Sequence, residues 1–330
     1  MSTAILGTGS YLPEKVLTSA ELGDRLGVGE QWIVDRTHIR ERRVAAADEA
    51  TSDLATAAAR RALRAAGLDA NDLDFLIVAT STPDQPIPAT ACTVQANIGA
   101  NRAAAFDVDA VCTGFIYALV TAHGLLCADS ASRTALVIGA DTYSRVLNYD
   151  DRRTCVLFGD GAGAVVLGRS RDRQGVLAST LGSDGTLADL VQIPGGGSRR
   201  PAGVDTLEAG QHFFAMRGKE VRQFADRILP EVVGRLLKSA ELDLGDVDLV
   251  VPHQANGVIL QELCEILELR PEQMHRTVDR YGNTGAASVP ITLDDAVRAG
   301  RVADGDVLLM VALGGGMTWG GAALRWGVPA

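Results

Sequence analysis

Two stretches of the sequence repeat one pattern half a chain apart: AAGLDANDLDFLIVAT at residues 65–80 and SAELDLGDVDLVVPHQ at residues 239–254. Each copy reads as the end of a helix, a short polar turn and a buried apolar strand. The copies are offset by 174 residues, and the matched positions are Leu68 with Leu242, Asp69 with Asp243, Asp72 with Asp246 and Asp74 with Asp248. The repeat predicts an internal duplication of two α/β halves, residues 1–172 and 173–330.

Continuous apolar runs elsewhere in the chain extend this prediction. They lack polar alternation, which is typical of strands that are covered on both faces. Helical stretches at residues 52–66 and 218–240 separate them. The sequence therefore predicts two sheets that share a central helical layer, an α/β/α/β/α architecture. The runs are Phe75–Ala79, Ala135–Gly139, Leu249–Val251 and Val307–Ala312.

Composition excludes several other classes of protein. The chain has 330 residues, 47% of them hydrophobic, and a net charge of -10, which argues against a nucleic-acid binder. Neither an apolar stretch of membrane-spanning length nor a signal peptide is apparent, so we expect a cytoplasmic protein. The five cysteines are irregularly spaced and form no CxxC, so we expect neither a disulfide framework nor a metal site.

Cys112 is the first residue whose setting points to chemistry. It follows a strand-like run, residues 103–108, and opens a helix-like run, residues 113–127. A thiol at a helix N-terminus lies at the positive end of the helix dipole, which lowers its pKa and favours the nucleophilic thiolate. Taken alone, Cys112 leaves a buried structural cysteine as the alternative.

Three further features lie at predicted strand ends. His253 ends the strand of the second repeat copy, at the edge where α/β proteins bind ligands. Asn283 stands among small residues in YGNTGAAS, residues 281–288. The run LGGGMTWG, residues 313–320, follows the last apolar strand, and its amides suit an oxyanion site. Taken singly, each feature has a structural alternative. His253 could be a hydrogen-bonded polar residue without a catalytic role, Asn283 could belong to a turn before a helix, and the glycine run could be a tight turn between strands. Together with Cys112 they form the set that Claisen chemistry on thioesters requires.

Motifs along nearly the whole chain strengthen this interpretation. They are GTGSYLP at 7–13, WIVDRTHIRER at 32–42, FGDGAG at 158–163, PHQAN at 252–256, GNT at 282–284, and GGG at 314–316 with TWG at 318–320. With these motifs the sequence resembles β-ketoacyl-acyl carrier protein synthase III, the initiating condensing enzyme of fatty-acid and some polyketide synthesis. The resemblance implies a thiolase-like, duplicated five-layer fold.

The resemblance also implies a role for each candidate residue. Cys112 would be the nucleophile that takes the starter acyl group. The backbone N–H groups of Cys112 and Gly315 would form the oxyanion hole of the acyl-enzyme. His253 and Asn283 would hydrogen-bond the malonyl thioester carbonyl and stabilise the enolate that forms when carbon dioxide leaves. The implied reaction is acyl transfer followed by decarboxylative Claisen condensation.

Substrate binding follows from the same resemblance. Trp32 and Arg152 would sandwich the adenine of coenzyme A, Arg36 would meet its phosphates and Asn256 would contact its pantetheine arm. The implied substrates are an acyl-CoA and either malonyl-acyl carrier protein or malonyl-CoA, with no metal or redox cofactor. The protein is expected to be a homodimer in which Ile87 reaches across to close the partner's acyl pocket.

The sequence departs from the family pattern at several positions. Thr113 stands where the family often has alanine, and Gly285 where serine is common. In the family, the helix after PHQAN carries basic residues that dock the acidic carrier protein. Here that segment, residues 257–270, contains Glu262, Glu265 and Glu268, and like charges oppose an acidic partner. A basic cluster that could dock the carrier protein instead comprises Arg217, Lys219, Arg222 and Arg227.

Two functions therefore compete. The first is a priming ketosynthase of fatty-acid or polyketide synthesis. The alternative is an acyltransferase on the same scaffold, which passes the acyl group to an alcohol, an amine or a carrier thiol without forming a carbon–carbon bond. The complete set of Cys112, His253 and Asn283 favours condensation, whereas the acidic helix favours the alternative. A non-catalytic binding protein would be expected to lack one of the three.

Overall fold

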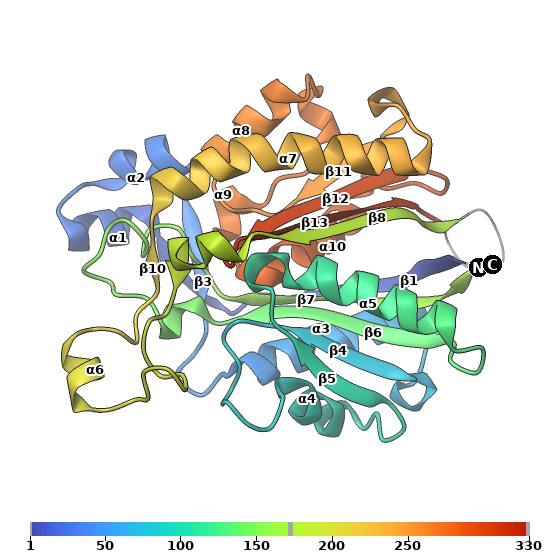
Figure 1. Ribbon diagram of the computed structural model, residues 1–330, viewed down its shortest axis with the longest axis horizontal. Helices are drawn as coiled ribbons and strands as arrows, with labels where there is room; N and C mark the ends of the chain where they lie inside the picture. The colour runs from blue at the N-terminus through green and yellow to red at the C-terminus, as the bar shows by residue number, and fades with distance from the viewer. Residues whose placement is uncertain (1, 171–173, 328–330) are drawn as a thin grey trace.

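The computed structural model describes residues 2–170 and 174–327 and arranges them in five layers (Figure 1). Two helices form the central layer between two sheets, and two pairs of helices cover the outer faces. This arrangement confirms the predicted α/β/α/β/α architecture. The central helices are α5 (Gly114–Ala128) and α10 (Ser288–Arg298), and the outer ones are α3 (Thr51–Ala66), α4 (Thr90–Ile98), α7 (Gly218–Ala240) and α8 (Gly257–Ile266).

The two sheets divide the chain into its two halves. The first sheet has the order β1 (Ser2–Tyr11), β7 (Gly161–Ser170), β6 (Thr134–Asp141), β4 (Phe75–Ala79), β5 (Ala104–Val108). The second has the order β11 (Leu249–Pro252), β12 (Val307–Gly314), β13 (Thr318–Arg325), β8 (Gly175–Ser183). Strand β4 runs parallel to β5 and β6, and β11 runs parallel to β12. The predicted boundary between residues 172 and 173 lies outside the described residues.

Shorter elements gather at one end of the layers (Figure 1). Some of them contribute residues to the lining of the site described below. They are β2 (Lys15–Thr18), α1 (Ser19–Leu26), α2 (Glu30–Thr37), β3 (Glu41–Val44), β9 (Val191–Gln192), α6 (Val204–Glu208), β10 (Ala215–Met216) and α9 (Val278–Tyr281).

Alternate side chains of the apolar strands enter different cores. In β12, one set packs into the core around the central helices and the other into the core beneath α7. Because successive side chains of a strand point to opposite faces, a strand covered on both faces must be apolar throughout. The first set is Leu308, Met310 and Ala312, and the second is Leu309, Val311 and Leu313.

The repeated aspartates have the same structural role in both halves. In the first copy, Asp72 Oδ2 accepts the N–H of Asp69 at 2.9 Å. In the second, Asp246 Oδ2 accepts the N–H of Asp243 at 2.8 Å. Each bond closes a 3-10 turn that leads into the parallel strand β4 or β11. The sequence repeat therefore records a repeated helix–turn–strand unit.

One segment corrects an expectation about the membrane. Residues Val111–Ala128 are long and apolar enough to span a membrane by composition alone, although no such stretch was expected. In the structure this segment comprises the turn at Cys112 and helix α5, and α5 packs between the two sheets. The central layer accounts for its composition, because this helix is covered by protein on both sides.

Candidate active site

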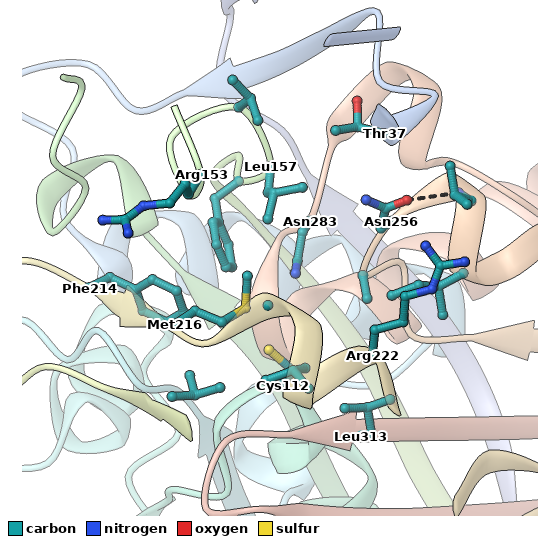
Figure 2. A pocket seen from close by; sticks show the side chains of 18 of the residues that line it. Thr37, Cys112, Arg153, Leu157, Phe214, Met216, Arg222, Asn256, Asn283 and Leu313 are labelled. Atoms are coloured by element: carbon teal, nitrogen blue, oxygen red, sulfur yellow. Dashed lines mark hydrogen bonds between the residues drawn. The ribbon is translucent and has the colours of Figure 1, made fainter. Parts of the chain in front are cut away.

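A cavity of about 460 Å³ opens where the strands of both halves end, and it brings the three predicted catalytic side chains together. Cys112 lies in the turn before α5, His253 follows β11, and Asn283 precedes the turn into α10. They are 8%, 6% and 5% exposed, respectively. Figure 2 shows the sulfur of Cys112 and the amide nitrogen of Asn283 directed into the same space, with Phe214 and Met216 along one side.

The backbone around Cys112 is strained. Val111 has φ +50, a left-handed conformation that is unfavourable for a β-branched residue. A 3-10 turn covers Val111–Thr113, and α5 begins at Gly114, one residue later than the expected start at 113. The turn presents the sulfur to the cavity. Strain of this kind persists only where surrounding contacts fix the conformation.

The glycine turn after β12 supplies those contacts. A Cβ at Gly314 would lie 2.9 Å from the backbone nitrogen of Cys112, so only glycine permits this approach. Thr318 Oγ1 donates to the carbonyl of Ala110 at 3.0 Å and also contacts Thr113 Oγ1 at 3.1 Å. Thr113, where the family often has alanine, thus ties the nucleophile turn to the glycine turn. Gly315 follows directly and lines the cavity.

The protonation state of Cys112 differs from the expectation. Burial raises the pKa of the Cys112 thiol to about 12, and the negative charge of Asp141 acts in the same direction. The prediction of a lowered pKa is therefore wrong. A helix terminus supplies only about 1 kcal/mol to a nearby charge, which is less than the cost of burying the thiolate. At neutral pH the residue is a thiol, so its attack on a carbonyl requires a proton acceptor.

His253 is held as a neutral imidazole. Its backbone N–H donates to the carbonyl of Val311 at 2.8 Å, and this bond continues the pairing of β11 with β12. Its Nδ1 lies 2.6 Å from Ser288 Oγ, and this fixes the plane of the ring. Burial lowers the pKa of His253 to about 3, so the ring carries no charge at neutral pH.

Asn283 is oriented by its own turn. Its Oδ1 accepts the N–H of Gly285 at 2.9 Å, which leaves the amide Nδ2 to face the cavity (Figure 2). The backbone N–H of Asn283 donates to the carbonyl of Leu157 at 2.9 Å, and its own carbonyl accepts the N–H of Gly159 at 3.0 Å. An N–H donor is therefore fixed on the wall of the cavity that also holds Cys112.

Comparison with known proteins identifies the family. Residues 106–185 match the family described as 3-oxoacyl-[acyl-carrier-protein (ACP)] synthase III, and residues 237–326 match its C-terminal part. The chain is 47% identical to a β-ketoacyl-[acyl-carrier-protein] synthase III of Caldanaerobacter subterraneus subsp. tengcongensis, over 99% of this chain and 98% of that one. The chain belongs to the 3-oxoacyl-[acyl-carrier-protein] synthase III family.

Relatives with other names are similar to the chain as well. The chain is 51% identical to "Acetoacetyl CoA synthase NphT7" of Streptomyces sp. (strain CL190), with 98% of both chains covered. The crystal structure of the synthase III of Aquifex aeolicus VF5 has a TM-score of 0.90 and 42% identity, covering 98% of this chain and all of that chain. The crystal structure of a priming β-ketosynthase of the R1128 polyketide pathway has a TM-score of 0.91 and 33% identity. The match covers 100% of this chain and 97% of that chain.

The side chains predicted to bind coenzyme A lie together at the cavity mouth. The guanidinium carbons of Arg36 and Arg152 lie 4.5 Å and 5.3 Å from the centroid of the Trp32 ring. An adenine between Trp32 and Arg152 needs about 7 Å, because each stacking contact takes about 3.5 Å. Arg152 must therefore move for the predicted sandwich to form. Asn256 also lines the cavity, where it caps α8 by accepting the N–H of Val258 at 2.8 Å (Figure 2).

Ion pairs within the protein neutralise the charge of two of the four residues predicted to dock the carrier protein. Arg217 pairs with Asp189 at 3.0 Å, and Arg222 pairs with Glu262 on α8. Helix α8 ends at Ile266 rather than at residue 270, because Glu268 adopts a left-handed conformation with φ +51. The remaining two basic residues of the cluster, Lys219 and Arg227, lie on the exposed side of α7.

Several residues near Cys112 and His253 were not predicted from the sequence, although the structure brings them together. They come from strand ends and turns that are distant in the sequence, and only their positions at those ends signalled a site. They are Ser81, Asp141, Tyr143 and Ser288.

Proposed function

We propose that this protein is a priming condensing enzyme, which takes an acyl group from an acyl-CoA onto Cys112 and joins it to a malonyl unit with loss of carbon dioxide. The observation that supports this most directly is the convergence of Cys112, His253 and Asn283 on one cavity with the glycine turn at Gly315. In the first step, the Cys112 sulfur attacks the thioester carbonyl. The N–H groups of Cys112 and Gly315 stabilise the oxyanion that develops.

The second step uses the two neutral donors on the cavity wall. Ser288 Oγ accepts a weak bond from the N–H of Gln254 at 3.4 Å, and we infer that its own proton goes to Nδ1 of His253. His253 Nε2 then carries the remaining ring proton and, with Asn283 Nδ2, donates to the malonyl carbonyl. Loss of carbon dioxide gives an enolate, which attacks the acyl-Cys112 thioester. Because decarboxylation generates the carbanion, the reaction needs neither a metal nor a redox cofactor.

We further propose that the preferred extender unit is malonyl-CoA rather than malonyl-acyl carrier protein. Glu265 on α8 and Glu268 just after this helix are exposed and keep this surface acidic, and the ion pair with Glu262 removes Arg222 from the charge available to an acidic partner. A relative of 51% identity that is named an acetoacetyl CoA synthase supports the same choice.

A direct competition tests both parts of this proposal. The protein acylated at Cys112 is mixed with malonyl-CoA or with malonyl-acyl carrier protein, and the products are resolved by mass. We expect a β-ketoacyl thioester of coenzyme A, with kcat/KM about tenfold or more in favour of malonyl-CoA, which corresponds to about 1.4 kcal/mol. A preference for the carrier protein would refute the choice of extender. Deacylation without release of carbon dioxide would instead indicate the acyltransferase.

A homodimer completes the proposed site. Ile87 is 83% exposed, which is unusual for a large aliphatic side chain and marks a surface that a partner subunit covers in the proposed dimer. We expect light scattering to give the mass of a dimer at micromolar concentration. We also expect Ile87→Asp to weaken the dimer, because it would place a charge in the contact. A monomeric wild-type protein would contradict this assembly.

A further inference from the structure

Arg42 on β3 is the largest of the fully buried side chains in the described part of the chain, and it is 1% exposed. None of the ion pairs that the described residues form includes it, so no carboxylate pairs with its charge. Burial lowers the pKa of Arg42 to about 10, so the guanidinium remains charged at neutral pH. Because taking a charge out of water is costly unless it gains good hydrogen bonds, the partners of this guanidinium indicate what the residue does.

The guanidinium of Arg42 bonds to two separate segments of the chain. Its Nη1 donates to the carbonyl of Leu17 at 3.2 Å and to Ser19 Oγ at 3.1 Å, where β2 leads into α1. Its Nη2 donates to the carbonyl of Val156 at 2.7 Å. The single proton of the Ser19 hydroxyl goes to the carbonyl of Ile39 at 2.6 Å, so the Ser19 oxygen accepts from Arg42. Arg42 thus joins the start of α1 to the segment around Val156.

The two segments that Arg42 joins form two sides of the cavity mouth. Helix α1 packs against α2, which holds Trp32, and we call these two helices the Trp32 wall. Val156 lines the cavity and belongs to a turn at residues 151–157, which holds Arg152 and which we call the Arg152 wall. Arg42 therefore adds three polar bonds to the apolar contact between the two walls. The buried residues of that contact are Leu22, Ile33, Cys155 and Val156.

Two glycines pack against the stem of Arg42. A Cβ at Gly159 would lie 2.9 Å from the Cβ of Arg42, and a Cβ at Gly282 would lie 3.4 Å from it. The backbone therefore closes around this stem, and a larger residue at Gly159 would displace it. Gly159 also donates to the carbonyl of Asn283 at 3.0 Å, so the backbone at Asn283 is anchored without Arg42.

The separation of the walls bears on ligand binding, because the predicted adenine site lies between Trp32 and Arg152. The guanidinium carbon of Arg152 lies 5.3 Å from the centroid of the Trp32 ring, and an adenine between them needs about 7 Å. The Arg152 side chain must therefore move, whereas the backbone of both walls stays in place if Arg42 holds it. Groups that are already ordered lose less entropy when a ligand binds. A guanidinium suits this task, because its planar fork bonds in two directions at once.

We propose that Arg42 is a positioning residue for the nucleotide half of coenzyme A, because it fixes the Trp32 wall against the Arg152 wall without contacting the ligand. Arg42 is not among the described residues that line the cavity. The inference rests on the proposed function, since that function supplies coenzyme A as the ligand. It gives Arg42 an effect on the affinity for coenzyme A and none on the chemistry at Cys112.

The test compares Arg42→Met with the wild type in two measurements. Methionine removes the charge and the three bonds, but its unbranched apolar side chain still fills the space. Isothermal titration calorimetry gives the Kd of coenzyme A, which we expect to rise about tenfold, corresponding to about 1.4 kcal/mol. Intact mass gives the rate of Cys112 acylation by acetyl-CoA and by S-acetylpantetheine, which lacks the nucleotide. We expect the half-saturating concentration of acetyl-CoA to rise about tenfold as well, with its maximal rate and the rate with S-acetylpantetheine within about twofold of the wild type.

Two further variants decide the question if thermal unfolding shows that Arg42→Met does not fold. Arg42→Lys keeps the charge but not the planar fork, so we expect it to retain part of the affinity for coenzyme A. Ser19→Ala removes the hydroxyl that accepts from Arg42 and donates to Ile39, and it leaves Arg42 in place. We expect it to raise the Kd of coenzyme A about threefold, as the loss of one modest hydrogen bond would.

A matched control is Arg43→Met, which removes the neighbouring guanidinium of β3. Successive side chains of a strand point to opposite faces, and Arg43 Nη1 donates to the carbonyl of Pro13 at 3.3 Å rather than to either wall. This variant should bind coenzyme A and undergo acylation as the wild type does.

Three results would overturn the inference. Arg42→Met could bind coenzyme A as tightly as the wild type, or it could lose the same factor with acetyl-CoA and with S-acetylpantetheine, as a purely structural role predicts. The wild type could also bind coenzyme A no more tightly than pantetheine. Failure of the proposed function gives a different result: coenzyme A binds, but no acyl-CoA acylates Cys112. The Kd values of the variants then still decide the role of Arg42.

Discussion

Cys112→Ala should abolish the acyl adduct that acyl-CoA forms with the wild-type protein. Cys112 is the only thiol among the described residues that line the cavity, and the glycine turn is built against its backbone. Removing a nucleophile of this kind typically costs about 10⁴-fold or more in rate. Intact-mass measurement after incubation with a panel of acyl-CoA thioesters gives the result directly, and the adduct on the wild type also identifies the starter group.

The control for this experiment is another cysteine. Cys92 is exposed and lies on α4, away from the cavity. Cys92→Ala should acylate as the wild type does, which excludes a general effect of removing a thiol. An adduct that persisted in Cys112→Ala, mapped to any other residue, would refute the assignment of the nucleophile.

Asn283→Asp should leave acylation of Cys112 intact and block condensation. The aspartate keeps the oxygen that accepts from Gly285 at 2.9 Å, so the turn is preserved, but it replaces the N–H donor with a negative charge. Loss of one such donor to a developing enolate or oxyanion costs about 10²–10³-fold, and the charge adds repulsion. Release of carbon dioxide from malonyl-CoA, measured on pre-acylated protein, is the readout.

Comparison with Asn283→Ala separates the two contributions of this residue. The alanine variant loses both the donor and the acceptor, so we expect it to lose decarboxylation and some stability as well. If Asn283→Asp condensed at the wild-type rate, Asn283 would have no part in stabilising the enolate. If it failed to acylate, the residue would act on the first step instead.

The sequence alone determined the architecture and the identity of the central residues. The repeat and the unbroken apolar strands follow from local rules, because a strand covered on both faces must be apolar at every position. The matched aspartates close the same turn in both halves, so their spacing was a reliable signal. Cys112 and His253 were predictable because each follows a strand, and strand ends of an α/β fold meet at one edge. The predicted strand end at Asn283 is wrong, because this residue follows the short helix α9.

Only the tertiary structure decided how these residues behave. The pKa of Cys112 is raised rather than lowered, because it depends on how much water the fold excludes and on the charge of Asp141, to which no local pattern points. Hydrogen bonds join Ser81 to Asp141 and to Tyr143 across the ends of β4 and β6. Burial and hydrogen bonds of this kind depend on contacts between segments far apart in the chain. The sequence therefore specifies which groups are present, and the packing of the two halves sets their charge, orientation and reactivity.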